Sequence, residues 1–488
     1  MPEHALASTT DPISQSIVAI VLIALFALLT LEKAHRVLVA LGAVSLLWAI
    51  TYLTPYHLIS FEAAARALDL NVLLLLAGMM AVVAVLKATG VFDWAVGRLV
   101  LRAGGRPDRM LALLVWGTGI ASAFLDNVTT VIFAAPIAVG TARQMGLAPR
   151  ALILPVIMAA NIGGAATLIG DPPNIMVGSG AGLSFVAFLE NVAAPVLVMM
   201  VLLVPLCRRW FAADLASAQA GAVAAAPSRP IADPLLLRWM LAISAGILLG
   251  FLTHGVTGMP AAIPATIGAA AALIAQDMLY LRTHRPSAEE RRHGILGVLE
   301  HEIEWPTLVF FAFLFIVVGA AVETGLIGSL ARTLEGGILA GRDSLGLDTE
   351  ATLFFAALLV LWTAGVLSAL IDNIPFVAVS IPIVHDLIPA LPGEATVLWW
   401  ALALGACLGG NGTPIGASAN VTTLDLAARA GVSVTFGAFT RFGATVVLMS
   451  LLVATAWLAA WIWLGPMPAL AGSLAVAALL AAGARALR

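Results

Sequence analysis

Four short groups of polar residues interrupt the apolar stretches of this sequence, and they carry its potential chemistry. Two are Asp-Asn pairs at 126–127 and 372–373, and two are breaks rich in Gly, Thr and Asn at 161–174 and 409–420. Carboxylates bind cations or exchange protons, whereas amides, hydroxyls and open backbone groups form hydrogen bonds with polar solutes. These residue types predict a binding site for an ion or a small polar solute.

The residues that we expect to line this site form two half-sites. The first half-site contains Asp126, Asn127, Thr129, Thr130, Asn161, Thr167, Asp171 and Asn174. The second contains Asp372, Asn373, Asn411, Thr413, Ser418 and Asn420. The sequence shows neither a metal-ligand spacing nor a nucleophile with a partner base, so we expect no metal, no cofactor and no enzyme.

Three aspartates have an alternative, simpler interpretation. Asp126 and Asp372 either cap helices at turns or handle ions or protons, and their place inside apolar, membrane-length segments favours the second role. Asp171 is either a turn residue before two prolines or part of the site. Its counterpart in the second half is Ala417, so we expect the two half-sites to differ in function.

Glycine and proline predict that two of the apolar helices are broken. Pro172 and Pro173 remove backbone donors and restrict the residue before them, so one helix cannot run through this stretch. The glycines that we expect to act as hinges are Gly163, Gly164, Gly170, Gly409, Gly410 and Gly416. The alternative is that helices pack closely at these glycines. Asn174 and Asn420 either satisfy the backbone groups freed at the breaks or line the site.

The second half of the chain repeats the first. An offset of 246 positions, the difference between 163 and 409, superposes the two Asp-Asn pairs. The same offset aligns Gly163-Gly164 with Gly409-Gly410, Thr167 with Thr413 and Asn174 with Asn420. Interrupted apolar segments at matching positions of two halves point to the binding site of a transporter.

The composition indicates a membrane protein. Of the 488 residues, 61% are hydrophobic and 10% are charged, and the mean hydropathy is +1.04. Soluble globular chains have roughly a quarter charged residues. The net charge of −3, without a basic cluster, gives no sign of a nucleic-acid partner. Cys207 and Cys407 are too few for a disulfide framework, and Cys407 is either a small packing residue or a ligand.

The apolar segments predict an all-α polytopic membrane protein of two inverted-topology repeats. Each repeat has a re-entrant helical hairpin, near 110–140 and 353–389, and a broken transmembrane helix, near 149–189 and 396–428. Arginines at both ends of the first hairpin place it on the cytoplasmic side, and the acidic stretch before the second places that hairpin outside. The same rule puts the amino terminus outside and the carboxyl terminus inside.

The expected domain boundaries follow from these segments. They are an exposed tail at 1–14, a first transmembrane repeat at 15–210, a cytoplasmic linker at 211–233, a second transmembrane repeat at 234–464 and an extra carboxyl-terminal transmembrane helix at 465–488. The linker is rich in Ala, Ser and Pro. It has no nucleotide-binding loop, so coupling to ATP would require another chain.

Several basic residues lie at the ends of the predicted crossings. Lys33, His35 and Arg36 occupy the connection between the first two, and we interpret them as part of a loop. Arg441 begins a later crossing, where it either anchors the helix or reaches a site for an anionic substrate. None of these residues is included in the expected site.

Three motifs together resemble a known family. Phe124–Asn127, Asn161–Asn174 and Gly405–Asn420 are similar to the arsenite permease and NhaD-type branch of the ion transporter superfamily, which also holds the melanosomal P protein and dicarboxylate carriers. The resemblance implies inverted repeats and elevator-type alternating access, often in a dimer. Sodium-coupled dicarboxylate carriers have Ser-Asn-Thr at the hairpin tips. The Asp-Asn pairs of this chain fit proton or cation exchange better, since a carboxylate exchanges protons.

The expected function is secondary active transport across the cytoplasmic (inner) membrane, with arsenite or antimonite exported in exchange for protons. As(OH)3 is a neutral triol, so a polar site of Asn, Thr and backbone groups suffices to bind it. The alternatives are a sodium/proton antiporter and an organic-anion permease of the dicarboxylate type. The expected partners are the lipid bilayer, protons or sodium as coupling ion, a second copy in a homodimer and an ATPase subunit, with no nucleic acid.

Overall fold

The computed structural model describes residues 11–31, 33–217, 230–283 and 297–486. These residues form helices joined by short connections, and no strand occurs among them. Eleven helices in this part of the chain are long and apolar enough to cross a membrane. The prediction of an all-α polytopic membrane protein is therefore confirmed.

The helices follow one another in two series. The first series is α1 (Pro12–Leu31), α2 (Arg36–Leu53), α3 (Phe61–Ala67), α4 (Leu70–Ala88), α5 (Val91–Ala103), α6 (Pro107–Phe124), α7 (Asn127–Gln144), α8 (Arg150–Gly164), α9 (Pro172–Ala181), α10 (Phe185–Trp210) and α11 (Ala212–Ala216). The second is α12 (Pro234–Thr257), α13 (Ala262–Thr283), η1 (Val298–Glu302), α15 (Trp305–Glu323), α16 (Leu326–Leu345), α17 (Thr349–Leu370), α18 (Asn373–Leu387), η2 (Ile388–Ala390), α19 (Val397–Gly409), α20 (Ser418–Arg429), α21 (Phe436–Leu464) and α22 (Pro466–Ala486).

The predicted tail and linker lie largely outside the described residues, as do residues 32, 284–296 and 487–488 of the other predicted segments. Of the tail at 1–14, residues 1–10 are outside, and α1 already begins at Pro12. Of the linker at 211–233, residues 218–229 are outside, and its first part forms the short helix α11.

Each repeat contains one helical hairpin and one broken helix. The hairpins are α6–α7 and α17–α18, whose turns lie at 125–126 and 371–372. The broken helices are α8–α9, interrupted at 165–171, and α19–α20, interrupted at 410–417. The structure thus places the interruptions where the glycine, proline and Asp-Asn signals predict them.

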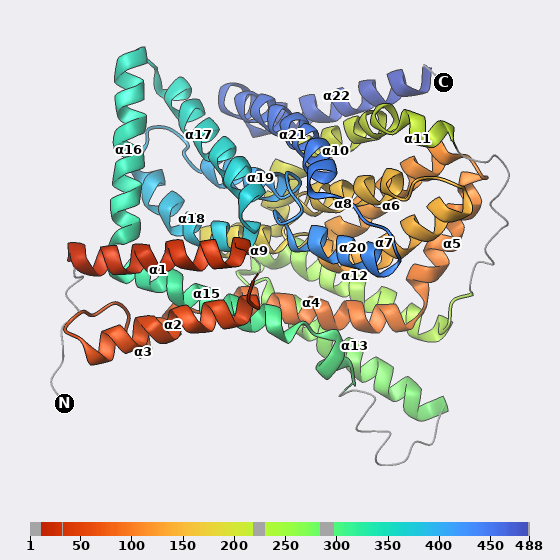
Figure 1. Cartoon of the computed structure of the whole chain (residues 1–488), viewed down its shortest axis with the longest axis horizontal. Helices are drawn as coiled ribbons and strands as arrows, with labels where there is room; N and C mark the ends of the chain where they lie inside the picture. The colour runs from red at the N-terminus through yellow and green to blue at the C-terminus, as the bar shows by residue number, and fades with distance from the viewer. Residues whose placement is uncertain (1–10, 32, 218–229, 284–296, 487–488) are drawn as a thin grey trace.

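The two hairpins approach the centre of the molecule from opposite sides (Figure 1). The breaks at 165–171 and 410–417 meet between them, because Asn161 of the first broken helix is hydrogen-bonded to Asn411 of the second. A separate layer of roughly parallel helices, α1, α2, α4, α12 and α15, lies along one face (Figure 1). The steeply inclined helices α5 and α16 connect this layer to the hairpins at the two ends of the molecule.

Glycine allows the hairpins and broken helices to pack with their backbones in contact. A Cβ atom on Gly163 would overlap the backbone of Gly119 in α6, and one on Gly409 would overlap Gly365 in α17. The two contacts are equivalent under the internal repeat. None of the six predicted hinge glycines has a positive φ. The close approach explains why glycine is needed here, and the hinge role stays a prediction.

Candidate functional site

The hairpin tips place a carboxylate at the start of a helix in each repeat. Asp126 precedes α7, and its Oδ1 accepts hydrogen bonds from the N–H groups of Val128 at 2.8 Å and Thr129 at 3.2 Å. The Thr129 hydroxyl donates to its Oδ2. Asp372 precedes α18 and accepts from the N–H of Ile374 at 3.1 Å. Both residues cap helices, and their carboxylate oxygens keep lone pairs for further partners.

A network of buried amides joins the two broken helices behind the tips. Nδ2 of Asn161 donates to Oδ1 of Asn411 at 3.0 Å and to Oδ1 of Asn420 at 2.9 Å. Oδ1 of Asn161 accepts from Nδ2 of Asn127 at 3.2 Å. All four side chains are almost completely buried. Since the network draws on both repeats, it fixes the two halves against each other at the centre of the molecule.

Cys407 belongs to this network through the internal symmetry. It occupies the position in the second repeat that Asn161 occupies in the first. Its thiol donates to Oδ1 of Asn174 at 3.3 Å, while Asn161 donates to Asn420, the counterpart of Asn174. Cys407 is therefore a hydrogen-bonding residue as well as a fully buried packing residue.

The asparagines after each break satisfy the opened backbone. Nδ2 of Asn174 donates to the carbonyl oxygen of Thr167 at 2.9 Å, and Nδ2 of Asn420 donates to that of Thr413 at 2.8 Å. The hydroxyls of both threonines donate to carbonyl groups at 123 and 369, near the ends of α6 and α17. These four residues thus hold the breaks and the hairpins in place, and their side-chain donors are occupied by the protein.

Other buried polar atoms in the same region lack a protein partner. Among the described residues, no hydrogen bond is made by Oγ1 of Thr130, Oδ2 of Asp171, Nδ2 of Asn373 or Nδ2 of Asn411. Asp171 precedes α9 without capping it and is 1% exposed. A buried polar atom without a partner costs about 1–3 kcal/mol. Four of them in one region indicate a place where a polar solute or water binds.

Two adjoining cavities lie in front of the tips. The larger, of about 630 Å³, is lined by five of the predicted site residues: Asp126, Asn127, Asp171, Asn373 and Ser418. The smaller, of about 290 Å³, is lined by Asp372 and again by Ser418. The other predicted residues do not line either cavity: Thr129, Thr130, Asn161, Thr167, Asn174, Asn411, Thr413 and Asn420.

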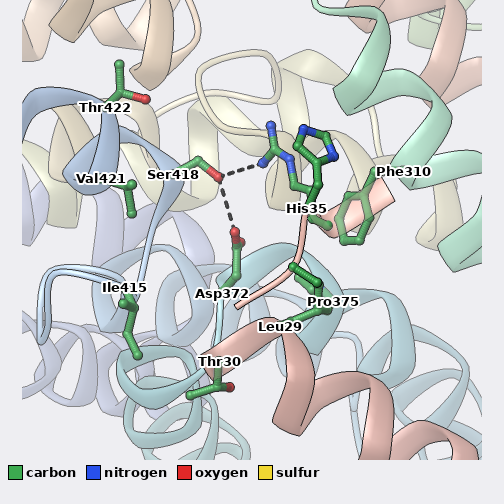
Figure 2. A pocket seen from close by; sticks show the side chains of 12 residues that line it. Leu29, Thr30, His35, Phe310, Asp372, Pro375, Ile415, Ser418, Val421 and Thr422 are labelled. Atoms are coloured by element: carbon green, nitrogen blue, oxygen red, sulfur yellow. Dashed lines mark hydrogen bonds between the residues drawn. The ribbon is translucent and has the colours of Figure 1, made fainter. Parts of the chain in front are cut away.

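Several charged or polar lining residues were missed by the sequence analysis, and Arg36 is the one among them that lines both cavities with a guanidinium group. It starts α2, and its Nη1 donates to Oγ of Ser418 at 3.2 Å while its Nη2 donates to Oγ1 of Thr307 at 2.7 Å. The Ser418 hydroxyl in turn donates to Oδ2 of Asp372 at 3.1 Å (Figure 2). Thr307 donates to Oε2 of Glu304 at 2.9 Å. One guanidinium therefore links two carboxylates through two hydroxyls.

Acidic side chains outnumber arginine in the lining of the larger cavity. Asp126, Asp171, Glu300 and Glu304 line it together with Arg36, His35 and His301. No group of three or more metal-ligating side chains occurs in the described part of the chain. The arrangement suits proton or cation exchange by the carboxylates, next to neutral amide and hydroxyl groups that can bind a polar solute.

The thiol of Cys407 gives a test of the amide network. We expect Cys407→Ser to keep the stability of the protein, because a hydroxyl can donate to Asn174 as the thiol does. Cys407→Ala leaves Oδ1 of Asn174 buried without this donor and should cost about 1–3 kcal/mol in addition to the loss of packing. Thermal unfolding of the purified variants measures both effects.

Cys207 supplies the matched control for this test. It is also fully buried, in α10, so Cys207→Ala measures the cost of removing a buried thiol away from the network. An equal loss of stability in Cys207→Ala and Cys407→Ala would show that the hydrogen bond to Asn174 contributes nothing.

Comparisons with known proteins identify several relatives of this chain. Residues 26–405 match the sequence profile of a family described as citrate transporter (CitMHS). An uncharacterized transporter of Mycobacterium bovis is 35% identical over 436 residues, which cover 88% of this chain and 95% of that protein. The 46 kDa membrane protein of Mycobacterium leprae is 35% identical over 449 residues, covering 89% of this chain and 96% of that protein.

The P protein of Homo sapiens is 30% identical over 512 residues, which cover 89% of this chain and 58% of the P protein. This match confirms the resemblance to the branch that holds the P protein. Among solved structures, the YdaH transporter of Alcanivorax borkumensis, described as having an unusual topology, matches with a TM-score of 0.60 at 16% identity. The match covers 89% of this chain and 100% of that chain, so the two share a fold.

Proposed function

The chain belongs to the citrate transporter (CitMHS) family of membrane transporters, and we propose that it is a secondary active transporter that exports arsenite or antimonite in exchange for protons. One observation carries the proposal: Asp126, Asp171 and Asp372 converge on adjoining cavities among buried polar atoms that lack protein partners. The carboxylates would exchange the protons, and the neutral donors would bind the hydroxyl groups of As(OH)3.

The charge of the lining argues against a polycarboxylate as the preferred substrate. Citrate is a polyanion at neutral pH, and in the larger cavity it would face four acidic side chains beside one arginine and two histidines. Repulsion between citrate and an ionised carboxylate a few ångströms away is strong where water is scarce. A neutral metalloid hydroxide avoids this repulsion.

Arg36 supplies a way to couple proton exchange to movement. It begins α2, in the layer of helices apart from the hairpins, yet it reaches Asp372 through Ser418. In the alternating-access cycle that we propose, the hairpins and broken helices move relative to this layer. Asp372 then loses its link to the guanidinium group of Arg36, so the movement changes the surroundings of a proton-exchanging carboxylate.

The proposed orientation puts both cavities on the cytoplasmic side. Both are lined by His35 and Arg36, and the larger one also by residues within 300–307; the distribution of Lys and Arg places these residues at cytoplasmic ends of crossings. We also propose that the protein resides in the cytoplasmic membrane, with its amino terminus outside and its carboxyl terminus inside. The proposed boundaries of the two repeats are those predicted from the sequence. A homodimer and an ATPase subunit are further proposals that rest on the family resemblance.

An organic-anion permease is the second candidate, and Arg36 is the observation that favours it. Arginine is the residue best suited to bind a carboxylate, and Arg36 lines both cavities. If an organic anion is the substrate, Arg36→Gln should abolish its uptake.

The deciding experiment uses inside-out membrane vesicles from cells without other metalloid exporters, energised with a proton gradient. We expect the vesicles to accumulate arsenite and antimonite, with no effect of sodium and complete loss on adding a protonophore. Collapse of the proton gradient by sodium, without metalloid uptake, would instead establish a sodium/proton antiporter. Uptake of citrate that requires Arg36 would establish the organic-anion permease.

A further inference from the structure

A third cavity, of about 700 Å³, lies apart from the candidate site. The start of α8, the end of α10 with α11, and the start of α21 form its walls. Three of its lining residues are arginines, Arg150, Arg209 and Arg441, and one is acidic, Asp214. The lining therefore carries an excess of positive charge.

Two of these arginines are available for an external anion. Nη2 of Arg150 forms an ion pair with Oδ1 of Asp214 at 3.2 Å. The acidic residue of the cavity therefore neutralises Arg150 and not the other two arginines. Throughout the described ranges, neither Arg209 nor Arg441 forms an ion pair with a carboxylate. Both are exposed. Their guanidinium groups can therefore take a ligand with two or more acceptor oxygens.

The remaining walls are those of a lipid-facing site. Leu154 is buried at the base of the cavity and Leu206 is half-buried beside it. Trp210 is 40% exposed at the end of the span α10, and its ring lies 5.4 Å from that of Phe442. Trp and Arg at the end of an apolar span mark the level of lipid headgroups. A cavity lined by both leucines and unpaired arginines suits an amphiphile better than a free anion.

From these observations we propose that the cavity binds an anionic phospholipid. The headgroup phosphate lies between the guanidinium groups of Arg209 and Arg441, and an acyl chain follows Leu154 and Leu206. Arginine binds phosphate oxygens in a bidentate manner, and basic pockets between transmembrane helices are known binding places for anionic lipids.

The test measures lipid binding to the purified full-length protein by native mass spectrometry and by thermal unfolding. We expect phosphatidylglycerol to bind and stabilise the wild type more than phosphatidylcholine does. Arg209→Gln with Arg441→Gln should weaken the binding of phosphatidylglycerol by about thirtyfold, since each arginine near an anionic lipid contributes about fivefold. The same two positions changed to Lys should bind phosphatidylglycerol more tightly than the Gln variant and more weakly than the wild type, because lysine keeps the charge and loses the bidentate geometry.

A matched control makes the same change of charge outside the cavity. Arg102 in α5 and Arg109 in α6 are exposed, so Arg102→Gln with Arg109→Gln tests non-specific attraction. Equal weakening by the control pair would overturn the proposal. Stabilisation of the same size by inorganic phosphate alone would overturn the lipid as ligand, and equal binding of phosphatidylcholine would exclude a headgroup site.

Discussion

Replacement of both Asp126 and Asp372 by asparagine is expected to reduce proton-coupled transport to the level of empty vesicles while the protein still folds. Asparagine caps helices as well as aspartate does, so the N–H groups of Val128 and Ile374 keep an acceptor. An amide cannot bind or release a proton in the physiological range. Transport into inside-out vesicles reports on proton exchange, and thermal unfolding reports on helix capping. Both are measured for the two single variants and the double variant.

The control for this pair is a carboxylate outside both cavities. Asp343 lies in α16 with its side chain 69% exposed, and Asp343→Asn should transport at the wild-type rate. Wild-type transport by the double variant would mean that Asp126 and Asp372 only cap helices. The proton would then have to be carried by another acidic residue of the lining, with Asp171 as the first one to replace.

The fold and part of the lining could be predicted because they depend mainly on local signals that occur twice. Pro172 and Pro173 cannot continue a helix, and the chain is interrupted just before them. A carboxylate followed by asparagine in the middle of an apolar segment marks both hairpin turns. The offset of the repeat then brings the tips and breaks together, because equivalent segments of the two halves pack around one centre.

Arg36 could not be predicted, since its role depends on a contact between distant parts of the chain. It is 382 positions from Ser418, and a basic residue between two crossings is fully explained by membrane orientation alone. Residue type also does not distinguish the asparagine side chains that donate hydrogen bonds to backbone carbonyl groups from those whose Nδ2 has no hydrogen-bond partner. Asn174 and Asn373 belong to similar patterns, yet only the packed structure shows that the Nδ2 donor of the first is occupied and that of the second is not.

A methyl group at Gly163 is expected to have the largest effect on folding. The Cβ of Gly163→Ala would overlap the backbone of Gly119, so α6 and α8 must move apart. Overpacking of this kind costs typically about 1–3 kcal/mol, and here rigid backbone rather than a flexible side chain has to yield. We expect a clear fall in the temperature of unfolding for Gly163→Ala and for the equivalent Gly409→Ala, and loss of monodisperse protein when both are combined.

The outcome also decides between packing and hinge motion for these glycines. Gly140 in α7 and Gly337 in α16 have open space where a Cβ would be, so Gly140→Ala and Gly337→Ala should unfold at or above the wild-type temperature. If the glycines serve packing, unfolding and transport fall together in Gly163→Ala. If they also serve as hinges, transport falls further than the loss of stability explains, because alanine restricts the backbone movement in addition to disturbing the packing against Gly119.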